Sequence, residues 1–346
     1  MARIYRDEDY RPRPNRRGSR PRTKTRPRHE SAVEGLVTAV DRGRYRVVLA
    51  DDSGGFPSSD PQGGDGPQSV TAVRASHLRK DAVVPGDIVK IVGDTSGAQG
   101  SLARLVDITE RRTLLRRSAD DIDPAERVIV ANVEALGIVT ATADPEPSYG
   151  LIDRAMTAAL DAGITPLLIV TKTDLAPADD IVERFRASGV EIVLSGLSAD
   201  GTPSVAEVYE RLRGRMSVLV GHSGVGKSTL MNALVPDAKR AVGVVNDVTG
   251  RGRHTSSSAI CLPLDGGGWL VDTPGVRSFG LAHVDRDSLL AAFPELTEAT
   301  LECPRGCLHQ ADSPGCRLDD WVAAGKAGPG GVSRLESLRR LLANTV

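Results

Sequence analysis

The chain has 346 residues, of which 40% are hydrophobic and 26% charged, a composition that excludes a protein disordered throughout. It contains no apolar run of the roughly 18 residues that a membrane span needs, and its N-terminus lacks the apolar segment of a secretory signal. We therefore expect a cytoplasmic protein without membrane contact. The net charge of −1 conceals an asymmetry, because residues 1–30 carry eleven Arg and Lys against four acids.

Residues 1–30 are rich in Arg and Pro and contain almost no aliphatic side chains, so they cannot bury a core. We predict a disordered basic arm. A basic arm on an acidic body favours contact with a polyanion such as nucleic acid, and a solvated tail without a partner is the alternative. The same choice applies to the basic segments 74–80 and 110–117, where we favour RNA contact over a solvated face.

Short strand-forming segments separated by turns occupy residues 31–109. Apolar residues and a central turn predict a hairpin over 33–49, followed by a Gly-, Ser- and Pro-rich insertion at 51–68 that we expect to be flexible. Further strands are predicted at 70–73, 85–92 and 103–108. About five short strands predict a small barrel of the OB type, with an SH3-like barrel as the alternative.

From residue 110 to 281, buried strand-like runs alternate with amphipathic helical segments. Apolar runs at 135–141 and 164–171, for example, are separated by a segment whose apolar residues recur at helical spacing. Such alternation predicts an α/β domain in which helices cover both faces of a parallel sheet. Residues 282–346 follow as a small, mostly helical C-terminal domain.

Residues 221–228 fit the phosphate-binding pattern G-x-x-x-x-G-K-[ST] and lie between a predicted strand and a predicted helix. Glycines allow backbone N–H groups to surround phosphate oxygens at a helix N-terminus. Lys227 would neutralise the β- and γ-phosphates during catalysis, and Ser228 would bind Mg²⁺ through its hydroxyl. The GTP-binding residues expected in this region are Gly221, His222, Ser223, Gly224, Val225, Gly226, Lys227, Ser228 and Thr229.

A second motif, Asp272-Thr-Pro-Gly275, ends another predicted strand. There Asp272 would hold Mg²⁺ through water, and the Gly275 N–H would reach the γ-phosphate. Upstream of it, Thr255 is the candidate switch hydroxyl for Mg²⁺, and the adjacent His254 would orient the attacking water, with a flexible loop carrying an incidental histidine as the alternative. Val276 stands where Ras-like enzymes have a water-positioning Gln, which predicts slow intrinsic hydrolysis.

Thr171-Lys-Thr-Asp174 resembles Asn-Lys-x-Asp, the motif with which GTPases recognise guanine. Asp174 would accept hydrogen bonds from guanine N1 and N2, a pair of donors that adenine lacks. Lys172 would lie along the base and brace the phosphate loop, whereas Thr171 replaces the usual Asn and leaves most base discrimination to Asp174. The GTP-binding residues expected here are Thr171, Lys172, Thr173, Asp174 and, in a loop closing over the base, Ser195.

The order of these motifs is unusual. In ordinary GTPases the phosphate loop comes first and the guanine motif last, whereas here the guanine motif precedes the phosphate loop and Asp-Thr-Pro-Gly follows both. The chain is therefore predicted to be a circularly permuted GTPase. In this arrangement the switch loop after Gly275 leads directly into the C-terminal domain. Ordering of that loop by the bound phosphate would therefore move the C-terminal domain.

Three of the four cysteines cluster with a histidine near the C-terminus. Cys303, Cys307, His309 and Cys316 offer three thiolates and one imidazole, a set that suits one tetrahedral, structural Zn²⁺. The metal would then supply much of the folding free energy of this segment. Free buried cysteines or a disulfide are the alternatives, and Cys261 is expected to be an ordinary core residue.

Together these motifs resemble the ribosome small subunit-dependent GTPase A family. The resemblance covers roughly residues 33–343 and rests on the permuted order, the phosphate loop, Gly252-Arg-His-Thr255, Asp-Thr-Pro-Gly and the Cys/His cluster. It implies an N-terminal OB barrel, a permuted GTPase domain at 110–281 and a zinc-binding C-terminal domain at 282–346. It also implies a catalytic role for His254.

The activity that this resemblance implies is Mg²⁺-dependent hydrolysis of GTP to GDP, stimulated by the 30S subunit. The implied role is late maturation of that subunit with binding to 16S rRNA, and we expect a monomer. Two features depart from the family pattern. One is Thr171, and the other is the spacing of the zinc ligands, which differs by one residue on each side of the Cys307/His309 pair. Two alternatives stay open: a nucleotide-gated RNA-binding or scaffolding protein with incidental hydrolysis, and a permuted GTPase of the large subunit.

Overall fold

A computed structural model of the chain describes residues 31–58, 67, 69–78, 82–98, 100–118, 126–236, 259–273 and 284–343. The predicted arm at 1–30 lies outside these residues, as do His254, Thr255, Gly275 and Val276. Within the described part of the chain, no helix has both the length and the apolar composition of a membrane span.

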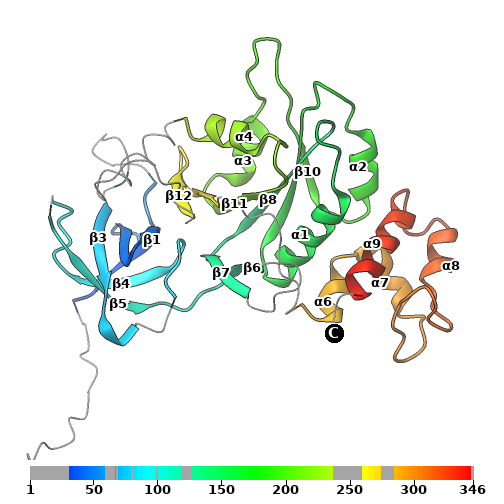
Figure 1. Ribbon diagram of the computed structural model, residues 1–346, viewed down its shortest axis with the longest axis horizontal. Coiled ribbons are helices and arrows are strands. Elements are labelled where there is room, and N and C mark those ends of the chain that lie inside the picture. The colour runs from blue at the N-terminus through cyan, green and yellow to red at the C-terminus, as the bar shows by residue number, and fades with distance from the viewer. Residues whose placement is uncertain are drawn as a thin grey trace, which may run out of the picture. The chain divides into compact units, whose positions relative to one another are not determined.

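The N-terminal strands form a closed barrel (Figure 1). Each strand pairs with the next in the order β1-β2-β3-β5-β4 and back to β1, and β3 pairs with β5 in parallel. This arrangement is the OB topology and not the SH3-like alternative, so the predicted barrel type is confirmed. The strands are β1 (Val33–Asp41), β2 (Arg44–Leu49), β3 (Ser69–Arg74), β4 (Ile88–Gly93) and β5 (Ala103–Ile108).

The barrel follows from the alternating pattern of its strands. Val47, Val70, Ile91 and Leu105 are almost completely buried and pack into one core inside the barrel. A two-residue turn joins β1 to β2, in which Gly43 has a φ of 84° that only glycine adopts without strain. The predicted hairpin is therefore present.

Five parallel strands form the central sheet, in the order β10-β9-β8-β11-β13, and β12 (Ile260–Pro263) pairs antiparallel to β13. The parallel strands are β8 (Ala135–Ala141), β9 (Thr165–Thr171), β10 (Glu191–Leu194), β11 (Met216–Val220) and β13 (Trp269–Asp272). The helices beside the sheet are α1 (Tyr149–Asp161), α2 (Asp179–Arg186), α3 (Ala206–Leu212) and α4 (Lys227–Leu234).

These helices cover both faces of the sheet, as the alternating sequence predicts (Figure 1). Leu136 and Ile138 of β8 share a core with Ile152 of α1 and Phe185 of α2. Because successive side chains of a strand point to opposite faces, Val139 lies in a second core instead. That core includes Val208 and Leu212 of α3 and Leu230 and Leu234 of α4.

The segment joining the barrel to the sheet is more structured than its charge suggests. The basic segment 110–117 includes part of β6 (Leu114–Ser118), which pairs with β7 (Glu126–Ala131) in a separate two-stranded sheet. Leu115 and Val130 face the core and are almost completely buried. Burial of these two apolar side chains explains why this charged stretch forms a strand.

Part of the predicted flexible insertion is also packed. The backbone carbonyl of Phe56 accepts a hydrogen bond from Trp269 Nε1 at 3.4 Å, and the buried Ser58 hydroxyl donates to the Leu264 carbonyl at 2.9 Å. In addition, Ala39 of β1 pairs with Ile260 of β12. The barrel is thus joined to the edge of the central sheet by hydrogen bonds.

The C-terminal helices lie together (Figure 1), and their buried side chains form a core of their own. Leu289, Phe293, Leu296, Leu318 and Leu338 are fully buried there. The helices are α6 (Arg286–Ala291), α7 (Pro294–Thr300), α8 (Leu318–Ala323) and α9 (Gly331–Ala343).

A buried charge network joins this helical core to α1. The side chain of Arg334 is 1% exposed; its Nε donates to Glu295 at 2.6 Å and its Nη2 donates to the Ala292 carbonyl at 2.9 Å. Arg334 also pairs with Asp153 of α1, which accepts a further hydrogen bond from the Ser337 hydroxyl. A charge that is removed from water is costly unless such partners surround it.

We predict that Arg334→Ala lowers the free energy of unfolding by about 3 kcal/mol, because two carboxylates would be left buried without their partner. The matched control is Arg186→Ala, which removes an exposed pair with Glu183 on α2 and should cost less than about 1 kcal/mol. Urea unfolding followed by tryptophan fluorescence measures both changes. Equal losses in the two variants would show that the network contributes no more than a surface pair.

Candidate functional site

The predicted phosphate loop lies between the end of β11 and the start of α4. Gly224 and Gly226 have φ values of 86° and 93°, which are strained for other residues. A Cβ atom at Gly221 would lie 2.2 Å from the carbonyl oxygen of Val139, so this position accepts only glycine. The glycines of the motif are therefore required by the geometry of the loop.

Lys227, the first residue of α4, folds back over this loop. Its Nζ donates to the carbonyl oxygen of Gly221 at 2.6 Å and also to that of His222. The ammonium group is thus held at the helix N-terminus, where phosphate groups bind most favourably. The remaining predicted residues lie on the loop or in the first turn of α4: His222, Ser223, Val225, Ser228 and Thr229.

The guanine-type motif lies directly beside the phosphate loop, although the two are about 50 residues apart in the chain. Thr171 ends β9 and is 5% exposed, and its Oγ1 lies 2.6 Å from the carbonyl oxygen of Val225. Lys172 follows in the left-handed region with a φ of 58°. Parallel pairing of β9, β8 and β11 places the carboxyl ends of these strands at one edge of the sheet.

The loop after β10 packs against the guanine-type motif. The Asp174 carboxylate accepts a hydrogen bond from the Leu197 N–H at 2.8 Å, and the Thr173 N–H donates to the Ser195 carbonyl at 3.4 Å. A Cβ atom at Gly196 would lie 2.6 Å from Thr173 Oγ1. Ser195 itself is almost completely buried. This geometry brings the predicted Ser195 loop next to Asp174.

One part of the site was not predicted from the sequence. The loop after β8 contacts both motifs: the Asp144 carbonyl accepts a hydrogen bond from Lys172 Nζ, and the Thr142 hydroxyl donates to the Lys172 carbonyl at 2.6 Å. Pro145 lies 3.5 Å from the Cβ position of Gly224. In the sequence, this loop could have been identified as part of the site from its position after a buried parallel strand, because ligands bind at the carboxyl ends of such strands.

Asp272 ends β13, as predicted, beside β11 in the sheet. Burial raises the pKa of this carboxyl, and a nearby cation would favour its charged form. Together with the hydroxyl of Ser228 it provides the hard oxygen donors that Mg²⁺ prefers. These residues therefore fit the ion, whereas the predicted partners Thr255 and Gly275 lie outside the described residues.

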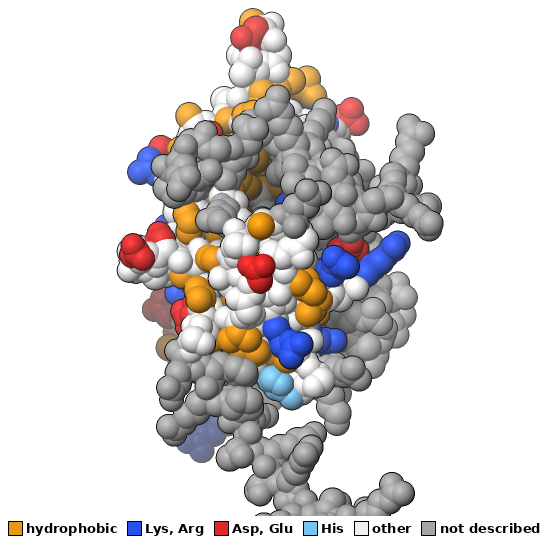
Figure 2. Space-filling model, turned by 90° about the vertical axis from the view of Figure 1, so that its left-hand side faces the viewer, with side chains coloured by type: hydrophobic (Ala, Val, Ile, Leu, Met, Phe, Trp, Pro, Cys, Tyr) orange, Lys and Arg blue, Asp and Glu red, His pale blue; other side chains and the backbone are white. Residues whose placement is uncertain are grey.

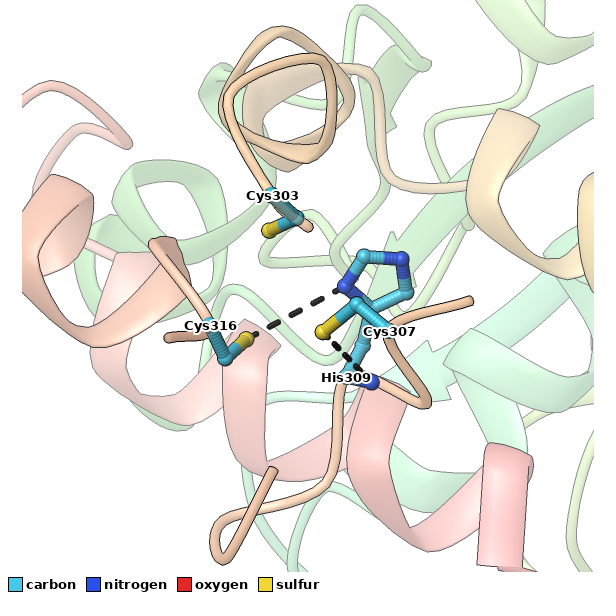
Figure 3. A group of neighbouring side chains, drawn as sticks. All are labelled: Cys303, Cys307, His309 and Cys316. Atoms are coloured by element: carbon cyan, nitrogen blue, oxygen red, sulfur yellow. Dashed lines mark hydrogen bonds between the residues drawn. The ribbon is translucent and has the colours of Figure 1, made fainter. Parts of the chain in front are cut away.

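The four predicted zinc ligands come together between α7 and α8 (Figure 3). Their ligand atoms all lie within 4.8 Å of one another, and Cys316 Sγ is 3.9 Å from His309 Nδ1. Backbone N–H groups point at the sulfurs: that of His309 lies 3.4 Å from Cys307 Sγ, and that of Arg317 lies 3.3 Å from Cys303 Sγ. Such N–H groups stabilise thiolates.

The chemistry of this cluster fits a single zinc ion. Three sulfurs and one imidazole nitrogen form a complete tetrahedral set, which is the pattern of structural sites. Burial, together with the nearby Arg286 and Arg339, lowers the pKa of His309 and so favours the neutral ring that ligation requires. Burial raises the pKa of Cys316 to about 11, so metal binding would have to displace its proton.

Cys261, by contrast, is an ordinary core residue, as expected. It lies on β12 and is 5% exposed within the same core as Val218 and Trp269. Burial raises the pKa of its thiol to about 12, which leaves it unreactive.

The chain is similar to known proteins of one family. Residues 108–282 match the model of the family described as RsgA GTPase. A Pseudomonas aeruginosa (strain LESB58) protein named small ribosomal subunit biogenesis GTPase RsgA is 37% identical over 285 residues, which cover 79% of each chain. A Marinobacter nauticus protein of the same name is 35% identical over 330 residues, which cover 93% of this chain and 90% of the relative.

Solved structures show the same fold. YjeQ from Thermotoga maritima superposes with a TM-score of 0.66 and 24% identity, covering 90% of this chain and 98% of its own. YloQ, whose structure is described as a circularly permuted GTPase, gives a TM-score of 0.62 at 23% identity, covering 90% and 97%. The permuted architecture predicted from the order of the motifs is therefore confirmed.

We predict that the purified protein contains one zinc ion per chain and that Cys316→Ala loses it, because three ligands no longer close the tetrahedron. The matched control, Cys261→Ala, removes a thiol outside the cluster and should keep the metal. Atomic absorption measures the zinc, and hydrogen exchange of α7 and α8 should increase only when it is lost. A metal content of zero in the unmodified protein would refute this assignment.

Proposed function

The chain belongs to the RsgA GTPase family and is a GTP hydrolase, and on that premise we propose that its hydrolysis serves biogenesis of the small ribosomal subunit. The relatives that span most of the chain are named for that role. Nucleotide binding by this chain is supported most directly by the contact between Thr171 and the carbonyl of Val225, which joins the guanine-type motif to the phosphate loop.

In the proposed reaction, the phosphate loop holds GTP while water attacks the γ-phosphate and GDP leaves. Backbone N–H groups of residues 221–228 and the Lys227 ammonium bind the phosphates, and they stabilise the charge that develops on them. Mg²⁺, when bound, neutralises the β- and γ-phosphate oxygens. Ser228 and Thr255 would hold it directly and Asp272 through water, while the Gly275 N–H would contact the γ-phosphate.

The base would bind between the end of β9 and the loop after β10. Asp174 would accept hydrogen bonds from guanine N1 and N2. Its carboxylate is held in position because one of its oxygens accepts a hydrogen bond from the Leu197 N–H. Lys172 would lie along the base, and the backbones of Thr173 and Ser195, which are hydrogen-bonded to each other, would border it. Adenine presents no matching donors, so the site selects guanine.

The attacking water would be oriented by the switch segment, which contains His254 and Thr255. A valine at position 276 has no group that orients water, so His254, next to the Mg²⁺-sensing Thr255, is the residue that we propose for this role. Hydrolysis by the isolated protein would then be slow. Contact with the small subunit is the event that we propose to complete the site.

The proposed partner is the 30S subunit, contacted through 16S rRNA. Basic side chains lie on the barrel, among them the exposed Arg42, Arg44 and Arg104. Figure 2 shows Lys and Arg side chains gathered beside a histidine on the side of the molecule that carries the barrel in Figure 1. Positive charge on a small barrel suits binding to an RNA backbone. We propose that the protein acts as a monomer in the cytoplasm.

We predict that purified 30S subunits raise the GTP hydrolysis rate at least about tenfold, whereas 50S subunits at the same concentration leave it unchanged. Phosphate release under multiple-turnover conditions measures both rates. An unchanged rate with 30S subunits, despite tight GTP binding, would favour a nucleotide-gated scaffold with incidental hydrolysis. Stimulation by 50S subunits alone would favour a role on the large subunit.

A further inference from the structure

The zinc cluster depends on a sharp turn of the backbone at His309. Cys307 and His309 are separated by a single residue, yet both contribute to one cluster, and the ring of His309 points towards Cys316 (Figure 3). The φ of His309 is 56°, in the left-handed region, which costs free energy for a residue that has a Cβ atom. Such a conformation persists only where the surrounding structure holds it.

Two arginines from other helices hold this turn. Arg339 of α9 donates from Nε to the carbonyl oxygen of His309 at 3.2 Å. Arg286 of α6 donates from Nη2 to the carbonyl oxygen of Leu308 at 2.6 Å. Two successive carbonyl groups are therefore fixed by side chains that lie 30 and 22 residues away in the sequence.

Arg339 also reaches the other end of the cluster. Its Nη1 and Nη2 atoms donate to the two carboxylate oxygens of Asp319 at 2.8 and 2.6 Å. Asp319 lies in the first turn of α8, shortly after the ligand Cys316. One guanidinium thus connects the backbone of His309 to the helix that follows Cys316. A lysine ammonium has a single nitrogen and cannot reproduce this planar set of donors.

The charge of the cluster favours the same arrangement. Three thiolates outweigh the two positive charges of Zn²⁺ by one, so a guanidinium beside the loaded site offsets the excess. We infer that Arg339 and Arg286 are positioning residues of the zinc site, which hold the backbone at His309 in the turn that ligation requires. Groups that orient a ligand in this way contribute about ten- to a hundredfold to metal affinity. The inference rests on the zinc assignment and requires neither nucleotide nor ribosomal subunit.

The first test measures zinc affinity by competition with a coloured chelator. We predict that Arg339→Ala weakens zinc binding about tenfold, and that the double variant with Arg286→Ala weakens it about a hundredfold. Arg339→Lys should keep most of the loss, because it restores the charge without the planar donors.

Arg317→Ala is the matched control, since Arg317 directly follows the ligand Cys316. Its guanidinium pairs with the exposed Asp320 on the surface. Its backbone N–H, which points at the sulfur of Cys303, is retained in the variant. Arg317→Ala should therefore bind zinc within about twofold of the unmodified protein.

Cobalt separates a positioning role from a general loosening of the helices. Co²⁺ can take the place of Zn²⁺ in such sites, and its visible absorption depends on the ligands and their geometry. The spectrum of Arg339→Ala should shift towards that of His309→Ala. Asp319→Ala removes the ion pair with α8 but leaves the His309 carbonyl its donor, so it should keep the spectrum of the unmodified protein.

Several results would overturn the inference. Unchanged zinc affinity in the double variant would show that these side chains do not hold the turn, and full recovery in Arg339→Lys would show that charge alone matters. A weakened affinity with an unaltered cobalt spectrum, or equal losses in Asp319→Ala and Arg339→Ala, would assign the effect to packing of α8 against α9. If the unmodified protein binds neither metal, the zinc assignment fails with the inference. A hydrolysis rate that 30S subunits leave unchanged contradicts only the proposed function.

Discussion

Parallel pairing of β9, β8 and β11 is the constraint on which the nucleotide site depends. The three strands end at the same edge of the sheet, so the segments that follow them meet wherever they occur in the chain. The contact between Thr171 and the Val225 carbonyl is the direct result. A change in the order of the strands along the chain leaves this edge intact, which explains how a permuted sequence assembles a GTPase site.

Because the chain is permuted, the last strand of the sheet leads into the C-terminal helices. The chain leaves the sheet after Asp272 and continues into the C-terminal helices, while α1, which follows the loop contacting Lys172, reaches the same helices through Asp153 and Arg334. The zinc cluster lies among those helices. The C-terminal unit is therefore joined to the nucleotide site both by the chain and by a buried ion pair.

Local patterns predicted most of the fold and the candidate site. The phosphate loop, the barrel hairpin and the Cys/His cluster each depend on residues close in sequence, and the structure brings their predicted members together. The contacts of Asp144 with Lys172, of Phe56 with Trp269 and of Arg334 with Asp153 were not predicted. Each joins segments that are distant in the chain, and the positions of such partners follow from packing, which leaves no periodic signal in the sequence.

Recognition of a guanine nucleotide at one edge of the sheet can be measured by competition between GDP and ADP for the unmodified protein, followed by calorimetry with Mg²⁺ present. We expect ADP to bind at least about a hundredfold more weakly, because adenine does not offer the Asp174 carboxylate the pair of donors that guanine N1 and N2 supply. Equal affinities for the two nucleotides would contradict it.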